Sequence, residues 1–183
     1  MTSPVNWAVL GLVIERPSYG LELAQRLIRA YGDVLPVSES HVYAALNALA
    51  DRGLVEVVLS GETERQPKPH YQATTVGRHA YEDWLVAQAE VESRRQELWV
   101  RELGVFARDP KAALRVLERF EDECLKGAGG VGRRDGSAPD ARAELIGALV
   151  AERQRVATDG VLKWLPYAQA RFEGLAGAAD DVA

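Results

Sequence analysis

The stretch from Ser38 to Leu54 constrains the chain most, because it predicts one sharply delimited helix. Ser38 is a favourable N-cap, since its hydroxyl can accept a hydrogen bond from a first-turn amide. Gly53 suits the left-handed residue that closes a helix. Apolar residues recur at three- and four-residue spacing and predict one buried face, made of Val42, Ala45, Leu46 and Leu49.

The other face of this helix carries hydrogen-bonding side chains of several lengths: Ser40, His41, Tyr43, Asn47 and Arg52. A helix with one apolar face and one polar, acid-poor face suits insertion into a DNA major groove. A surface helix that happens to carry small polar residues explains this stretch equally well. The neighbouring segments therefore have to decide between the two interpretations.

Two helices are predicted upstream. Pro4–Ile14 is apolar nearly all round, with Ser3 as its cap and a proline at its first position, where proline is tolerated. The second helix runs from Tyr19 to about Tyr31, is capped by Ser18 and has an apolar inner stripe. A short linker joins it to the Ser38 helix, so the pair is typical of a helix–turn–helix.

The hydrophobic period changes after Leu54. Leu54–Leu59 is β-branched and predicts a strand, and His70–Thr74 predicts a second strand returning beside it. The polar loop between them contains Arg65 and Lys68, two candidates for phosphate contacts. A hairpin with a basic loop directly after a helix–turn–helix is typical of a wing. The sequence therefore predicts a winged helix–turn–helix domain over residues 1–87.

The remaining residues, 88–183, predict a helical domain. Thr74 or Thr75 caps a helix that continues through residues 78–103, either as one helix or as two. Asp109 and Pro110 mark a restart. A glycine-rich stretch at 127–138 predicts a flexible linker, followed by a last helix of about 30 residues that Pro166 bends or ends. The fold class expected is mainly α with a small β-hairpin.

Charge and composition limit the possible functions. The net charge is −5, and the first 75 residues carry six basic and eight acidic side chains, net −2. This acidic balance counts against DNA binding unless the basic side chains are concentrated on one side of the domain. A single cysteine, Cys124, excludes an internal disulfide framework and a cysteine metal cluster. No apolar run approaches a membrane span, and no signal peptide is recognisable, so a cytoplasmic protein is expected.

No catalytic centre can be recognised. The sequence shows no nucleophile–base pair, so an enzyme is not expected, and no cofactor is predicted. His79 and Glu82 have the spacing of a metal-binding pair, but without a third ligand a solvated helix face explains them better. Cys124 lies on an apolar stripe and is expected to be buried rather than redox-active.

Several motifs together resemble the PadR family of bacterial transcriptional regulators. They are Tyr19-Gly20-Leu21-Glu22-Leu23, then Val42-Tyr43-Ala44-Ala45-Leu46 with Leu49 and Gly53-Leu54, then Tyr71-Gln72-Ala73-Thr74 with Gly77-Arg78 and Trp84-Leu85. The segment Arg95-Gln96-Glu97-Leu98 and the helices after it are similar to the helical C-terminal half of larger, virulence-activator-like members. The motifs are individually loose but occur in the family's order and spacing.

The resemblance implies a homodimer that binds a palindromic operator on double-stranded DNA, usually as a repressor. The family's phosphate-binding tyrosines map to Tyr19 and Tyr43, and the base-edge candidates are Ser38, Ser40, His41 and Asn47. Two features depart from the family pattern. Prolines separate Arg65 from Lys68 and His70 in the wing, and Ser40 stands where the recognition helix often has glycine.

The family also suggests a small aromatic effector, and Trp99, Phe106 and Trp164 could line its cavity. A core or a dimer interface is the more common role of such an aromatic stripe. One further function class remains open, because a fold alone does not fix a function. The chain could be a winged-helix protein-interaction module whose acidic surface never meets DNA.

Overall fold

The computed structural model describes residues 3–59, 69–128 and 141–180. The chain divides into two compact units, Met1–Arg94 and Arg95–Ala183. Helix α4, Thr75–Leu103, begins in the first unit and ends in the second.

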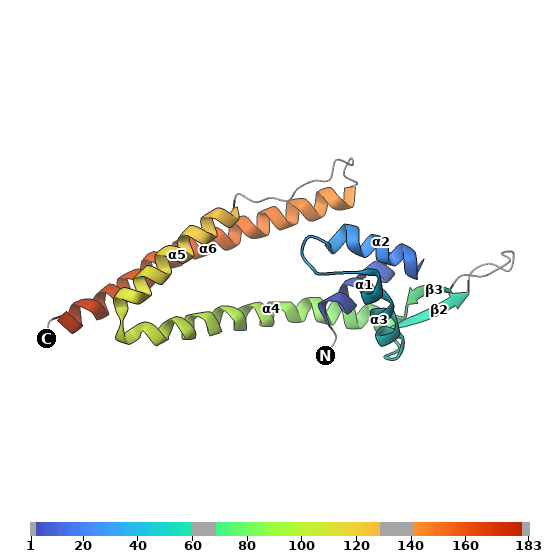
Figure 1. Ribbon diagram of the computed structural model, residues 1–183, viewed down its shortest axis with the longest axis horizontal. Coiled ribbons are helices and arrows are strands. Elements are labelled where there is room, and N and C mark those ends of the chain that lie inside the picture. Colours follow the sequence, from blue (N-terminus) through green and yellow to red (C-terminus); the bar gives the residue numbers. More distant parts are fainter. Residues whose placement is uncertain (1–2, 60–68, 129–140, 181–183) are drawn as a thin grey trace. The chain divides into compact units, whose positions relative to one another are not determined.

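Three helices pack together at the start of the first unit (Figure 1). They are α1, Pro4–Glu15; α2, Gly20–Tyr31; and α3, Glu39–Ala50. Their apolar residues make one core that also takes in Leu54, Val55 and Ala73. α1 lies centrally in this core, since it contacts α2, α3 and the sheet, and this explains why its sequence is apolar nearly all round.

The helix boundaries follow the predicted capping signals, with one correction. The Ser3 hydroxyl accepts a hydrogen bond from the Asn6 amide at 3.3 Å, and Gly53 has the left-handed φ of 65° expected of it. The prediction that Ser18 caps the second helix was wrong: Tyr19 is the N-cap of α2, with no side-chain cap hydrogen bond. Ser18 is instead fully buried in a short strand.

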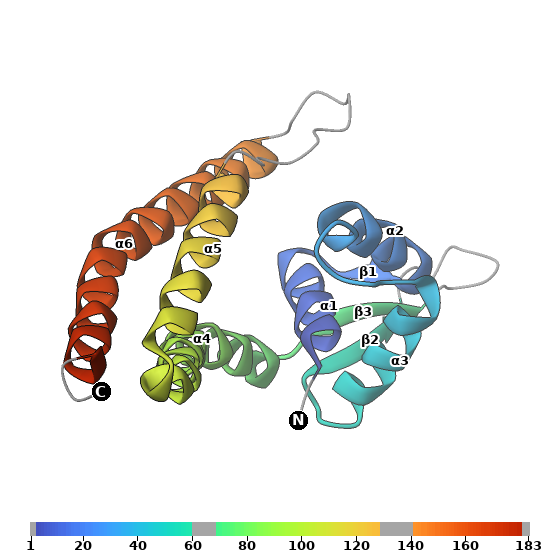
Figure 2. The ribbon, with the colours of Figure 1, turned by 60° about the vertical axis from the view of Figure 1, so that its left-hand side comes forward.

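That strand, β1 (Ser18–Tyr19), belongs to a three-stranded antiparallel sheet with the order β1-β3-β2. The two predicted strands are confirmed as β2, Val55–Leu59, and β3, Pro69–Ala73. Ser18 lies opposite Tyr71, and Tyr19 lies opposite His70. Figure 2 shows this sheet beside α1 and α3. The loop that joins β2 to β3 lies outside the described residues.

The helix after the sheet begins as predicted. The Thr74 hydroxyl accepts a hydrogen bond from the Gly77 amide at 2.9 Å, which caps α4. α4 then continues without a break to Leu103, so the predicted region 78–103 is one helix. In its first half Trp84 stacks on Trp7 of α1, with ring centroids 5.1 Å apart.

The second unit contains the end of α4, a short 3-10 helix at Gly104–Arg108, and two long helices that lie side by side (Figures 1 and 2). α5 is Pro110–Ala128, and its predicted cap Asp109 accepts from the Ala112 amide at 3.0 Å. α5 therefore includes the first two residues of the predicted linker at 127–138. The residues from 129 to 140 lie outside the described part of the chain.

α6, Ala141–Asp180, is 40 residues long, which is longer than predicted, and Pro166 does not end it. Proline removes one helical hydrogen bond, but packing can offset this loss. Leu165 is 1% exposed and Ala168 is 5% exposed, so the residues on both sides of Pro166 are held in the core of this unit. Tertiary packing thus supports the helix at the position where the sequence predicted a bend or an end.

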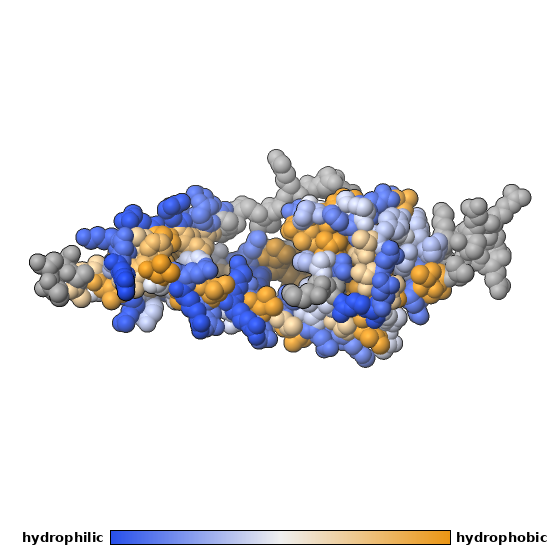
Figure 3. Space-filling model, turned by 60° about the horizontal axis from the view of Figure 1, so that its bottom comes forward, coloured by the Kyte–Doolittle hydropathy of each residue, from blue (hydrophilic) through white to orange (hydrophobic). Residues whose placement is uncertain are grey.

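The buried core of the second unit is small. Among the described residues it consists of Leu103, Ala113, Leu117, Leu165 and Ala168, with half-buried aromatic side chains around them. Many large apolar side chains of this unit remain exposed, and Figure 3 shows such orange patches between charged residues. Within the described residues, no helix combines the length and the apolar character that a bilayer span requires.

Candidate nucleic-acid interface

α3 separates its two faces completely. The apolar residues Val42, Leu46 and Leu49 are 0% exposed, and Ala45 is 1% exposed. The predicted base-edge residues are all exposed on the remaining surface of the helix or at its cap: Ser38, Ser40, His41 and Asn47. The buried face therefore fixes α3 against the rest of the first unit, and the candidate contact residues face solvent.

The first turn of α3 is held by a reciprocal capping box. The backbone N–H of Ser38 donates to Nδ1 of His41 at 3.1 Å. The Ser38 hydroxyl lies 2.9 Å from the Ser40 hydroxyl. Because Nδ1 accepts a backbone hydrogen bond, the neutral His41 ring carries its proton on Nε2.

This capping role of His41 was missed from the sequence. A capping box is recognised by Ser or Thr followed three residues later by Glu or Gln, and here histidine fills the second position. The spacing was therefore visible, but the residue type was not the usual one. His41 holds the start of α3 with one ring nitrogen and has the other one available as a donor.

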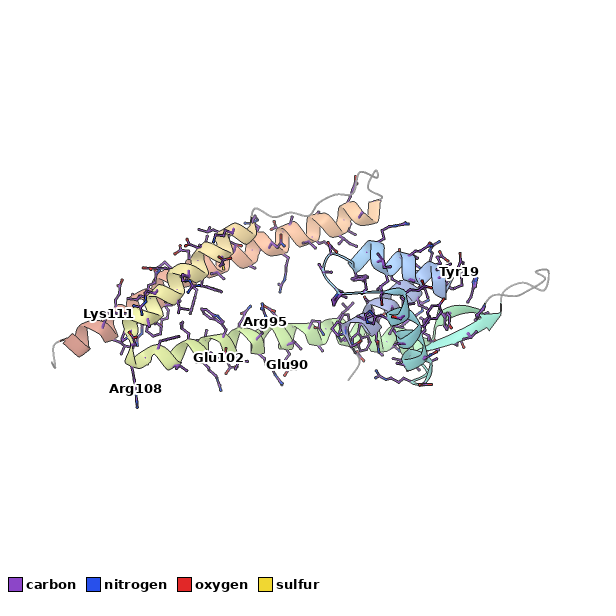
Figure 4. All side chains as sticks on the ribbon, in the orientation of Figure 1. Tyr19, Glu90, Arg95, Glu102, Arg108 and Lys111 are labelled. Carbon is purple, nitrogen blue, oxygen red and sulfur yellow. The ribbon has the colours of Figure 1, made fainter. Side chains whose placement is uncertain are left out.

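Tyr43 packs against the start of α2. A Cβ atom added to Gly20 would lie 2.6 Å from the Tyr43 ring carbon Cε1, so only glycine permits this close approach. Tyr43 nevertheless remains 43% exposed. Tyr19, which precedes Gly20 in the sequence, also lies where α2 meets α3, at the start of α2 (Figure 4). The fold thus brings both predicted phosphate-binding tyrosines to the α2–α3 junction.

Tyr19 also connects the helices to the base of the wing. It is half-buried, and its ring lies 5.9 Å from the ring of His70, its partner across β1 and β3. His70 is a further residue of this surface that the sequence did not single out. The reason is that β1 has only two residues and leaves no alternating pattern to detect.

The wing residues Arg65 and Lys68 lie outside the described residues, so their predicted phosphate contacts remain a prediction. Among the described arginines of the first unit, Arg16 forms an ion pair with Glu22 at 2.5 Å. Arg26 forms another with Glu15 at 3.1 Å. Part of the small positive charge of this unit is therefore engaged within the protein.

The three aromatic residues predicted to line a ligand cavity meet in the second unit. Trp99 stacks on Phe120 with ring centroids 4.4 Å apart, and Trp164 meets Trp99 edge-on at 5.7 Å. Phe106 packs against the same core. Trp99 therefore contacts aromatic side chains of both α5 and α6, and these rings pack at the junction of α4, α5 and α6.

The remaining reactive side chains suggest structural roles. Cys124 is half-buried, and burial raises the pKa of its thiol, with the negative charge of Glu123 adding to the rise. A raised pKa keeps the thiol protonated and weakly nucleophilic. His79 and Glu82 are both exposed. Among the described residues, no three His, Cys, Asp or Glu side chains are grouped so that they could hold a metal ion.

Taken together, three helices, a three-stranded sheet and an exposed polar face on α3 define the first unit as a winged helix–turn–helix domain. Residues 9–83, within this domain, match the family model of PadR-like transcriptional regulators. The resemblance seen in the sequence is thereby confirmed over this part of the chain. No curated protein matches the chain.

Several solved structures are similar to this chain. Bacillus subtilis PadR in complex with operator DNA is 18% identical, with a TM-score of 0.46 over 90% of this chain and 99% of that one. A PadR-like regulator from Bacillus cereus is 21% identical, with a TM-score of 0.43 over 52% and 90% of the two chains. A transcriptional regulator from Clostridium thermocellum is 24% identical, with a TM-score of 0.40 over 49% and 87%.

Proposed function

We propose that this chain is a transcriptional repressor that binds a palindromic operator as a homodimer. The observation that carries the proposal is the division of α3 into a fully buried apolar face and an exposed polar face. Such a helix can enter the major groove while its apolar face stays fixed in the domain. Asn47 can pair bidentately with adenine, and Ser40 can reach either a donor or an acceptor on a base edge.

The tyrosines supply the contacts that set the register of the helix. Hydroxyl groups commonly bond phosphate oxygens and position a protein on DNA without reading its sequence. Tyr19 and Tyr43 lie at the α2–α3 junction, beside the exposed face of α3. Arg65 and Lys68 in the wing would add charged phosphate contacts.

The second unit supports the proposal of a dimer. The described part of this unit buries few residues and leaves large apolar side chains exposed along the first half of α6. We call these residues the α6 stripe: Leu145, Ile146, Leu149, Val150 and Val156. Exposed apolar surface of this kind marks an interaction site. A second copy of the chain would bury it and hold two α3 helices at a fixed spacing.

An aromatic effector fits the same proposal. A small aromatic molecule could insert among Trp99, Phe106 and Trp164, since Trp99 and Trp164 meet edge-on and Phe106 packs against the same core. Such an insertion would shift α4 against α6 and change the spacing of the two DNA-binding units. The expected consequence is weaker operator binding.

The acidic charge favours a second candidate, a winged-helix module that binds a protein. An assay separates the two: fluorescence anisotropy of labelled DNA from upstream of the protein's own gene, at stepwise salt concentrations, with the dimer confirmed by light scattering. For a repressor, the logarithm of the binding constant should fall linearly with the logarithm of the salt concentration. A confirmed dimer that does not bind this DNA or genomic fragments at low salt would contradict the repressor.

A further inference from the structure

The Arg26 side chain of α2 is largely buried, with only 12% of it exposed. Its guanidinium group donates to four acceptors within the first unit. One terminal nitrogen donates to the Leu12 carbonyl at 2.8 Å and to the Glu15 carboxylate at 3.1 Å. The other donates to the Ser18 hydroxyl at 2.7 Å and to the Arg16 carbonyl at 3.4 Å.

Two of these bonds close the end of α1. The last carbonyl groups of a helix have no partner within the helix and need one from elsewhere. Arg26 adds donors at this end of α1 from the neighbouring helix. The Leu12 carbonyl, which already accepts from the Arg16 backbone N–H at 3.3 Å, gains a second donor, and the carbonyl of the C-cap residue Arg16 also accepts from Arg26. A cation at a helix C-terminus is also favoured by the helix dipole. α1 and α2 are therefore joined by a charged, directional contact as well as by packing.

The bond to Ser18 extends the connection to the sheet. Ser18 is 0% exposed and lies in β1, where it pairs with Tyr71. Its hydroxyl accepts from Arg26 and donates to the Arg16 carbonyl at 3.4 Å. The next residue is Tyr19, which pairs with His70 and begins α2. One guanidinium thus holds α1, β1 and α2 immediately before the tyrosine proposed to bind phosphate.

We propose that Arg26 is a positioning residue for DNA binding. It does not contact DNA itself, because its guanidinium is occupied inside the domain. It fixes Ser18 by a hydrogen bond. Because Ser18 and Tyr19 form β1, this bond also fixes Tyr19 and its partner His70 at the base of the wing. Both residues are thereby held in the positions that the proposed contacts with the DNA backbone require. This inference rests on the proposed function, and it assigns a contribution to DNA affinity to a side chain that is largely buried.

The test uses the full chain and three variants. Arg26→Lys keeps the charge but loses the planar fork, so it cannot make all four bonds. Ser18→Ala removes the hydroxyl that accepts from Arg26 and donates to the Arg16 carbonyl, and it leaves the guanidinium group in place. Arg29→Lys, an exposed arginine of the same helix, is the matched control. Operator affinity is measured by anisotropy, and the folded fraction by thermal unfolding.

The expected result is a loss of affinity of about tenfold for Arg26→Lys and for Ser18→Ala, the size expected for one buried charge-assisted hydrogen bond. Both variants remain folded at the assay temperature, and Arg29→Lys binds as the unmodified protein does. We expect Tyr19→Phe to reduce affinity less when it is introduced into the Arg26→Lys variant than when it is introduced into the unmodified protein. A merely structural role would leave these two effects additive.

Amide hydrogen exchange of the free protein gives an independent readout. Ser18→Ala is expected to speed exchange in the β1–β3 pairing while the α3 core stays protected. Unchanged exchange at this pairing, additive effects on affinity, or full operator affinity of Arg26→Lys would each overturn the inference. Failure of the unmodified protein to bind DNA would instead contradict the proposed function, and the exchange result would still decide whether Arg26 holds β1.

Discussion

At the scale of single residues, several side chains combine a structural and a recognition role. Ser38 and His41 cap α3 through each other, although the sequence suggested only that Ser38 is a cap and that both are base-edge candidates. Tyr43 packs on Gly20 and is still exposed. Residue type and spacing predict where a polar group lies on a helix. They do not predict which neighbour it bonds, because that depends on side-chain rotamers.

His41→Ala is expected to lower the free energy of unfolding by about 1 kcal/mol, the typical cost of a lost helix cap. His41→Gln should lose much less, since glutamine is the usual residue at this position of a capping box. Chemical denaturation of both variants measures the difference. Equal stability of the two variants would mean that the ring nitrogen of His41 does not cap α3.

Asn47→Ala is expected to weaken operator binding and to relax the base preference at one position, at a cost of about 1–3 kcal/mol in discrimination. Tyr43→Phe should weaken binding to all sequences alike, because a phosphate contact carries no sequence information. Binding to a set of single-base operator variants separates the two effects. An unchanged base preference in Asn47→Ala would exclude direct readout by this side chain.

At the scale of elements, the predictable features were those with local signals. Periodicity and caps located α1, α3, α4 and α5, and β-branched residues located β2. Elements that depend on distant partners were not predictable. β1 exists only because Ser18 and Tyr19 pair with β3, and α6 continues past Pro166 only because its neighbours are buried.

Gly20→Ala tests the close approach of α2 and α3. The new Cβ would lie 2.6 Å from Tyr43 Cε1, so the Tyr43 ring must move. Overpacking of this kind costs about 1–3 kcal/mol, and operator affinity should fall as well. Gly160→Ala is the control, because nothing lies within 4 Å of its added Cβ. Wild-type stability and affinity of Gly20→Ala would show that the Tyr43 ring is not held there.

At the scale of the whole molecule, the two units differ in how much core they bury. The first unit has a continuous core from α1 to the sheet, which is the part matched by the family model. Among its described residues, the second unit has a core of five buried residues and exposes the α6 stripe. The sequence predicted the apolar stripe of this helix. It could not show that much of the stripe would stay uncovered within one chain.

Leu149→Lys places a charge in the middle of the α6 stripe. If a second copy buries this surface, the variant should shift to a monomer, because an unpaired charge is costly to bury. Glu144→Gln, exposed on another side of α6, changes the net charge by the same amount and should leave the dimer intact. Light scattering at matched concentrations measures both. A dimeric Leu149→Lys protein would place the interface elsewhere.

Under the proposed function, two copies of α3 read one operator together. Sequencing of the genomic fragments that the purified protein retains tests this directly. We expect enrichment of an inverted repeat whose half-site centres are separated by about one helical turn or a multiple of it. Enrichment of no shared sequence, or of a single unpaired half-site by a confirmed dimer, would contradict it.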